Sequence, residues 1–189
     1  MIIYLIGVHH SIQHDGGDLG NIPGLAALRE QFRYYLMKTL EELGVSVLAE
    51  ELNEDALAIF NTPESLARSI AGKSGVSHVF CEPSWEMRKS LGFTGKLQRK
   101  HHVIRELFWY NKIVDYKGER IIFICGANHI PSFTALIRKK GQHAIVLTPY
   151  YGQGFFSNFD YHLDCERCGL RESHADIAKY HPNQRTDLH

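Results

Sequence analysis

Short apolar runs alternate along the chain with longer segments in which apolar residues recur every three or four positions. The apolar runs cover residues 2–8, 45–49, 77–81, 120–125 and 143–147. Each run has the length and composition of a strand that is buried on both faces of a sheet. The alternation predicts an α/β fold of three layers, in which helices cover both faces of a mainly parallel central sheet of about five strands.

Residues that begin or end helices mark the segments between these runs. Pro23 opens a helix with one apolar face, and Gly44 ends it. Residues 53–55, which begin with Asn53, are expected to cap a short helix over 56–60. Thr62, followed by Pro63, is the expected N-cap of the next helix. Two further helices are expected over about 95–114 and over 131–140.

The regular pattern stops after Pro149. We therefore expect an α/β core over residues 1–150 and an aromatic, then polar, C-terminal extension over 151–189 that forms a flap or a tail. The aromatic stretch 150–156 is suited to a lid or to contact with a planar ligand.

Overall composition excludes some classes of partner. The chain has 189 residues and a formal net charge of zero, so it has no general basic field that would attract nucleic acid. No apolar run approaches the eighteen residues of a membrane span, and the four cysteines do not form a disulfide framework. Cys81 and Cys125 follow apolar runs and are expected in the core. We expect a cytoplasmic protein with a small-molecule or peptide substrate, no membrane association and a homo-oligomeric state.

Ionisable side chains follow four of the five expected strands. They are His9 and His10, Glu50 and Glu51, Glu82, and finally His129, which the polar residue Asn128 precedes. In a parallel sheet, ligands bind beyond the carboxyl ends of the strands, where these residues would meet. Glu82 is the weakest member of this group, because a residue that precedes a proline is more often a capping or surface residue.

Two Gly-x-x-His turns, 7–10 and 126–129, supply the histidines of this group. A glycine after a strand permits a sharp turn and the close approach of a ligand or a neighbouring strand. His129 also precedes the helix that begins at Pro131, and a helix N-terminus disfavours an imidazolium. A neutral imidazole is what metal binding or hydrogen-bond catalysis requires.

The long helix expected over 95–114 carries Arg105, Glu106 and Trp109. Arg105 and Trp109 are four positions apart and share a face. They form either a surface stack or a pair that leans over the site, where the arginine would bind an anionic group. We also expect His9, Gln13, Asn128 and Glu106 to contact a bound cofactor.

A second metal site is a weaker hypothesis for the C-terminal region. Cys165 and Cys168 form a C-x-x-C pair, which His174 follows, and tetrahedral zinc sites use such ligands. The spacing matches no zinc-finger pattern well, so unligated, reduced cysteines are the preferred interpretation.

With these motifs, the chain resembles the superfamily of TraB/PrgY proteins, Tiki proteases, erythromycin esterases and ChaN-like haem-binding proteins. The shared marks are the turns 7–10 and 126–129 and the glutamates after the run 45–49, in motif order over residues 2–148. It is also similar to uncharacterised bacterial proteins with a doubled glutamate and the Arg-Glu-x-x-Trp sequence, here 105–109. The resemblance implies an α/β core with clustered His10, His129 and Glu50 or Glu51. The family's large helical insertions are missing here, so its substrates do not transfer.

The leading functional hypothesis is a metal-dependent hydrolase. His10, His129 and one of Glu50 and Glu51 would hold a divalent metal that activates water, and the other glutamate would be the general base. Arg105 would bind an anionic substrate or a developing oxyanion. A metal-free variant, in which histidine and glutamate activate water directly, stays open. The alternatives are a non-catalytic protein that binds haem, a metal or a nucleotide-like ligand at the same place, and a partner-binding subunit in which the cluster is incidental.

Overall fold

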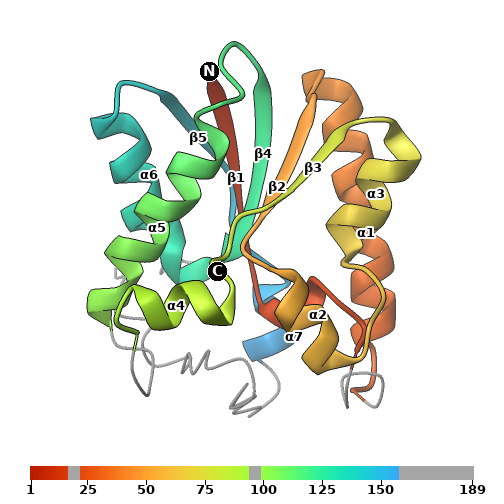
Figure 1. Cartoon of the computed structure of the whole chain (residues 1–189). Coiled ribbons are helices and arrows are strands. Elements are labelled where there is room, and N and C mark those ends of the chain that lie inside the picture. Colours follow the sequence, from red (N-terminus) through yellow and green to blue (C-terminus); the bar gives the residue numbers. More distant parts are fainter. Residues whose placement is uncertain (17–21, 94–98, 158–189) are drawn as a thin grey trace, which may run out of the picture.

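The computed structural model describes residues 1–16, 22–93 and 99–157 (Figure 1). The strands are β1 (Ile2–Val8), β2 (Val47–Glu50), β3 (Ser77–Phe80), β4 (Arg120–Gly126) and β5 (His143–Tyr151). The α-helices are α1 (Leu25–Leu43), α2 (Glu54–Phe60), α3 (Leu66–Ser74), α4 (Trp85–Ser90), α5 (Arg99–Ile113), α6 (Ile130–Lys139) and α7 (Gln153–Ser157). Short 3-10 helices, η1 (His10–Ile12) and η3 (Ala127–His129), follow β1 and β4.

The five strands form one sheet in the order β3-β2-β4-β1-β5, and every neighbouring pair is parallel. Helices α1 and α3 lie on one side of the sheet and α5 and α6 on the other (Figure 1). This arrangement confirms the predicted three-layer α/β fold.

Each face of the sheet has its own hydrophobic core. In β1, Tyr4, Ile6 and Val8 pack with the apolar faces of α1 and α3, whereas Ile3 and Leu5 pack with those of α5 and α6. Successive residues of a strand point to opposite faces, so a strand buried on both faces is apolar throughout. The continuous apolar run at residues 2–8 is the sequence signature of this central position.

Two helix predictions need correction. Helix α3 begins after Ser65, whose hydroxyl caps it by accepting a hydrogen bond from the Arg68 amide at 3.0 Å. The predicted cap, Thr62, instead donates to Asp15 at 2.9 Å, because the segment that holds it is still a loop. The second correction concerns α4, which the sequence pattern did not reveal and which precedes α5.

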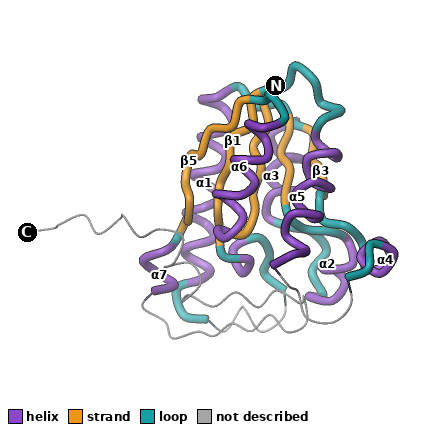
Figure 2. The backbone as a smooth tube through the Cα atoms, turned by 90° about the vertical axis from the view of Figure 1, so that its left-hand side faces the viewer, coloured by secondary structure: helices purple, strands orange, loops and turns teal. Residues whose placement is uncertain are grey.

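The last strand is longer than its apolar run. β5 continues through Pro149 to Tyr151, so it crosses the boundary predicted at residue 150. Proline is compatible with this position because β5 is an edge strand. Figure 2 shows α7 directly after the end of β5. Tyr150 and Phe156 are buried in the same hydrophobic core as the apolar face of α1, and a lid or flap formed by this region stays a prediction.

The described helices include none that is both long and apolar enough to cross a membrane. Cys81 and Cys125 are buried, as predicted for small core residues. The zinc hypothesis for Cys165, Cys168 and His174 concerns residues outside the described part of the chain.

Candidate functional site

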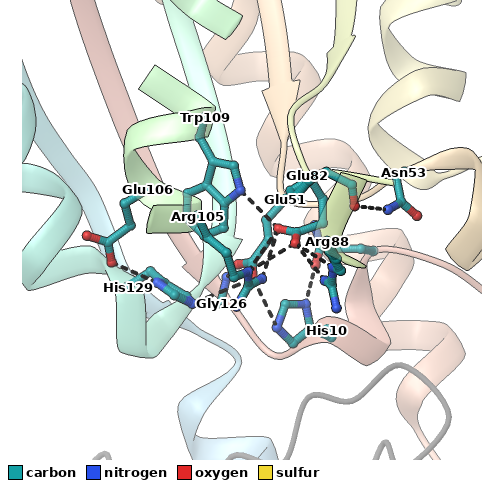
Figure 3. Close-up of polar contacts among 12 residues, drawn as sticks. His10, Glu51, Asn53, Glu82, Arg88, Arg105, Glu106, Trp109, Gly126 and His129 are labelled. Atoms are coloured by element: carbon teal, nitrogen blue, oxygen red, sulfur yellow. Dashed lines mark hydrogen bonds and ion pairs between the residues drawn. The ribbon is translucent and has the colours of Figure 1, made fainter. Parts of the chain in front are cut away.

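Side chains from β1, β2, β4 and α5 meet at the carboxyl ends of the strands (Figure 3). Glu51 lies at the centre, directly after β2. Its Oε1 is 4.0 Å from His10 Nε2 and 3.6 Å from His129 Nε2. Two of the other three predicted metal ligands, His10 and His129, therefore lie within 4.0 Å of the Glu51 carboxylate.

Glu51 is buried but ionised. Its Oε2 accepts a hydrogen bond from the Gly126 amide at 2.7 Å, and its Oε1 contacts Arg105 Nη2. Burial alone would raise the pKa of the Glu51 carboxyl. The pKa nevertheless lies below its ordinary value, because the Arg105 guanidinium, His10 and the Gly126 amide all favour the carboxylate. The site thus contains a fixed, desolvated negative charge.

His129 is fully buried, and both of its ring nitrogens are engaged. Nδ1 lies 2.8 Å from Glu106 Oε1, and Nε2 lies 3.3 Å from Arg105 Nη1. A guanidinium only donates, so Nε2 is the acceptor and the ring proton is on Nδ1. The pKa of His129 is lowered to about 3, chiefly by burial and also by Arg105, while Glu106 opposes the shift. Ser132 donates to the same Glu106 oxygen at 2.5 Å.

Glu82 is the second centre of the network, which corrects the expectation of a capping or surface residue. It is buried, and Arg88 donates to its Oε1 at 2.6 and 3.1 Å. Arg105 donates to it at 2.9 to 3.2 Å, and Trp109 Nε1 donates to its Oε2 at 2.9 Å. Arg105 is therefore held between Glu51 and Glu82, and it lies 5.1 Å from the Trp109 ring centre. Of the two interpretations of this Arg–Trp pair, the buried position at the site is the observed one.

His10 differs from His129 because one of its ring nitrogens has no partner. Nδ1 lies 2.8 Å from Gln13 Oε1, in the turn that η1 creates. Since that oxygen accepts, the ring proton is on Nδ1 and the lone pair is on Nε2. Within the described residues, Nε2 has no hydrogen-bond partner, and it faces Glu51.

A cavity of about 20 Å³ adjoins these two groups. Its wall includes His10, Glu51, Glu82, Arg88 and Arg105. A volume of this size corresponds to about one water molecule.

Glu50 does not join this cluster. Successive residues at a strand end point to opposite faces, so the side chain of Glu50 lies on the other face of the sheet from that of Glu51. There its Oε1 contacts Ser65 and lies 2.8 Å from His78 Nε2. The structure thus separates the two adjacent glutamates, and no metal is required to offset a repulsion between them.

One of the predicted cofactor contacts, His9, packs against another part of the chain. His9 Nδ1 lies 2.8 Å from Ser11 Oγ, and the His9 ring stacks on Phe156 at 4.4 Å. Asn128 Oδ1 is buried and has no hydrogen-bond partner in the described part of the chain. Gln13 and Glu106, by contrast, hold the two site histidines.

The Arg105 guanidinium lies among the atoms predicted to bind a divalent metal. It contacts Glu51, and it donates a hydrogen bond to His129 Nε2, the nitrogen that would otherwise bind the metal. A metal ion placed here would be repelled by the guanidinium and would compete for the same donors. Over residues 1–16, 22–93 and 99–157, no group of three or more His, Cys, Asp or Glu side chains is arranged to hold a metal ion. In this arrangement the residues do not fit the predicted ion.

Sequence reasoning missed Arg88 and undervalued Glu82. Glu82 follows a short apolar run, as Glu51 does, and this shared position already indicated that both are site residues. Arg88 carried no signal, because it lies on the unpredicted helix α4.

Comparisons with protein-family models, with curated proteins and with solved structures found no match to this chain. The resemblance to the TraB-containing superfamily therefore stays a prediction from short motifs.

Proposed function

We propose that this protein is a hydrolase in which His10 and Glu51 activate a water molecule. The supporting observation is that two hydrogen-bond acceptors, His10 Nε2 and Glu51 Oε1, face each other at 4.0 Å beside a water-sized cavity. A water molecule can donate one hydrogen to each acceptor. Its oxygen lone pairs are then free to attack an electrophile.

In the proposed reaction, His10 Nε2 takes a proton from the water as the oxygen attacks the carbonyl carbon of an ester. The Glu51 carboxylate stabilises the imidazolium that forms, and Gln13 keeps the ring oriented through Nδ1. His10 then returns the proton to the leaving alkoxide, so that the products are an acid and an alcohol. Arg88 and Arg105 line the cavity and stabilise the oxyanion.

Charge favours an ester over a phosphoester. The network contains three carboxylates, of Glu51, Glu82 and Glu106, and two guanidinium groups, of Arg88 and Arg105. With His129 neutral, its formal charge is −1, because three negative charges face two positive ones. A phosphate dianion would be repelled by this excess, whereas a neutral ester would not.

This proposal follows the metal-free variant of the predicted chemistry. A divalent metal, a bound haem, a homo-oligomeric state and a cytoplasmic location stay predictions.

The test is hydrolysis of p-nitrophenyl acetate and butyrate by the full chain at pH 7.5, with and without EDTA. His10→Ala should lower kcat/KM by about 10²-fold or more, which is the usual contribution of a general base. His143→Ala is the matched control, because His143 is an exposed residue at the start of β5. Equal activity of His10→Ala and wild type, or no hydrolysis by the wild type above the rate in protein-free buffer, would refute the proposal. Loss of activity in EDTA would refute its metal-free form.

A further inference from the structure

A second, larger cavity lies beside the first. Its volume is about 300 Å³, it is open to solvent, and it is lined by residues of α1, of the turn at His14 and Asp15, and of the loop that leads into α3. Such a volume is in the range of small-molecule sites. His14 lines both cavities. The proposed hydrolysis uses none of the cavity's other residues.

Arg29 gives this cavity its chemical character. The residue is 8% exposed, and its Nε donates to the Ser11 carbonyl at 2.9 Å. Its Nη2 is buried and has no hydrogen-bond partner in the described structure. Burial lowers the pKa of Arg29, while Asp15 opposes the shift, yet a guanidinium stays protonated at neutral pH. A buried donor of this kind is costly unless something accepts its proton.

Two more side chains of the cavity have a buried nitrogen without a hydrogen-bond partner among the described residues. Arg33 binds Glu30 through Nε at 3.2 Å, but its Nη1 is buried without a partner among the described residues. His14 stacks on Phe60 at 3.8 Å, and its Nδ1 also has no partner in that part of the chain. Burial, aided by Arg29, lowers the pKa of His14 to about 3, so its imidazole is neutral and can donate without adding charge. Two guanidinium N–H groups of residues that line this cavity, at Arg29 Nη2 and Arg33 Nη1, can thus donate to a ligand, and His14 Nδ1 can donate or accept according to its tautomer.

We infer that this cavity binds a small carboxylate ligand through the guanidinium groups of Arg29 and Arg33. The planar, two-donor edge of a guanidinium matches the two oxygens of a carboxylate.

The cavity's own acidic residues decide which anion fits. Asp15, Glu30 and Glu64 line it together with the two arginines, so three negative charges face two positive ones. Asp15 and Glu64 are exposed, and the Glu30 side chain is 69% exposed, so these carboxylates lie on the rim. A singly charged carboxylate is repelled less by this rim than a phosphate dianion is.

The experiment measures the thermal unfolding midpoint of the full chain at pH 7 in sodium acetate, sodium phosphate or sodium chloride at equal ionic strength. A ligand that binds only the folded state raises the midpoint in a saturable way. We expect acetate to do so more than chloride and phosphate. Arg29→Lys keeps the positive charge but removes the paired N–H donors of the guanidinium, and Arg33→Gln removes the charge. Each variant should weaken acetate binding about tenfold or more.

Arg68→Gln is the matched control, since Arg68 pairs with Glu54 outside this cavity and should leave the acetate effect unchanged. If Arg29→Lys fails to fold, Arg33→Gln carries the test, because Arg33 is only partly buried. An equal response to acetate and chloride, or an acetate effect that survives both variants, would mean that the cavity holds water only. Tighter binding of phosphate than acetate would contradict the assignment of a monoanion. Each outcome is independent of any hydrolytic activity.

Discussion

The two Gly-x-x-His turns follow neighbouring strands of one sheet, yet their histidines lie in opposite situations. His129, after β4, is fully buried, and Glu106 and Arg105 engage both of its ring nitrogens. His10, after β1, uses one nitrogen for Gln13 and presents the other to Glu51 and the small cavity. The motif places a histidine at the sheet edge, and the elements that cover it decide what the histidine can do.

The difference follows from the position of α5. This helix covers the end of β4 with Arg105, Glu106 and Trp109, and the His129 ring packs 4.7 Å from the Trp109 ring. The turn η1 brings only Gln13 to His10, from the same short segment. We therefore interpret His129 as a residue that positions Arg105, and His10 as the residue that exchanges a proton.

The largest expected effect separates the two histidines by stability. His129→Ala should lower the free energy of unfolding by about 3 kcal/mol or more, because it leaves a cavity and removes a partner from both Glu106 and Arg105. His10→Ala should lower it by about 1 kcal/mol, since Nε2 has no partner to lose. Urea denaturation followed by circular dichroism measures both values. Similar losses for the two variants would contradict the comparison.

A smaller effect should separate the two glycines. A Cβ at Gly7 would overlap the backbone carbonyl of Pro149 in β5, so Gly7→Ala should cost about 1–3 kcal/mol of stability. A Cβ at Gly126 would lie 2.9 Å from His10 Nε2, at the end of a side chain that can rotate away. Gly126→Ala should therefore cost less stability than Gly7→Ala.

Activity gives the other half of this test. Because the displaced atom is the proposed base, Gly126→Ala should lower ester hydrolysis at least tenfold, an effect of about 1.4 kcal/mol on the barrier. The two variants are compared by urea denaturation and by kcat/KM. A Gly126→Ala protein with full activity would show that the position of His10 does not matter.

The last test uses pH, whose effect on stability accumulates over several pH units. His14 and His129 have pKa values of about 3 when folded, below the ordinary 6.5, so the unfolded chain binds more protons between these values. Stability should be complete above pH 6.5 and fall as the pH decreases toward 3, by up to about 1.4 kcal/mol per pH unit for each histidine. His14→Phe keeps the stack on Phe60 and should reduce this slope.

The control for the pH series is His143→Phe, which alters an exposed histidine and should leave the slope unchanged. Urea denaturation between pH 7.5 and 4.5 measures the series. A slope that is the same in wild type and His14→Phe would show that His14 is not held neutral.

Prediction from sequence succeeded where one local property decides the structure. The run at residues 2–8 became β1 with the predicted bounds, because a strand buried on both faces must be apolar throughout. Asn53 caps α2 as expected, accepting from the Ala56 amide at 2.8 Å. Prediction failed for the N-cap of α3. Thr62 and Ser65 can both cap a helix, and in the folded chain the cap is Ser65.

The sequence by itself determined that histidines and glutamates collect at the carboxyl ends of parallel strands, because short-range periodicity defines the strands and the residues after them. It left Glu50 and Glu51 equivalent, it ranked Glu82 lowest of the strand-end residues, and it gave no signal for Arg88. Only the tertiary structure decided that Glu51 faces His10, that Glu50 faces His78, and that Arg105 lies between two carboxylates. The reason is physical: which face a strand-end side chain takes depends on register, and its charge partners come from helices distant in sequence.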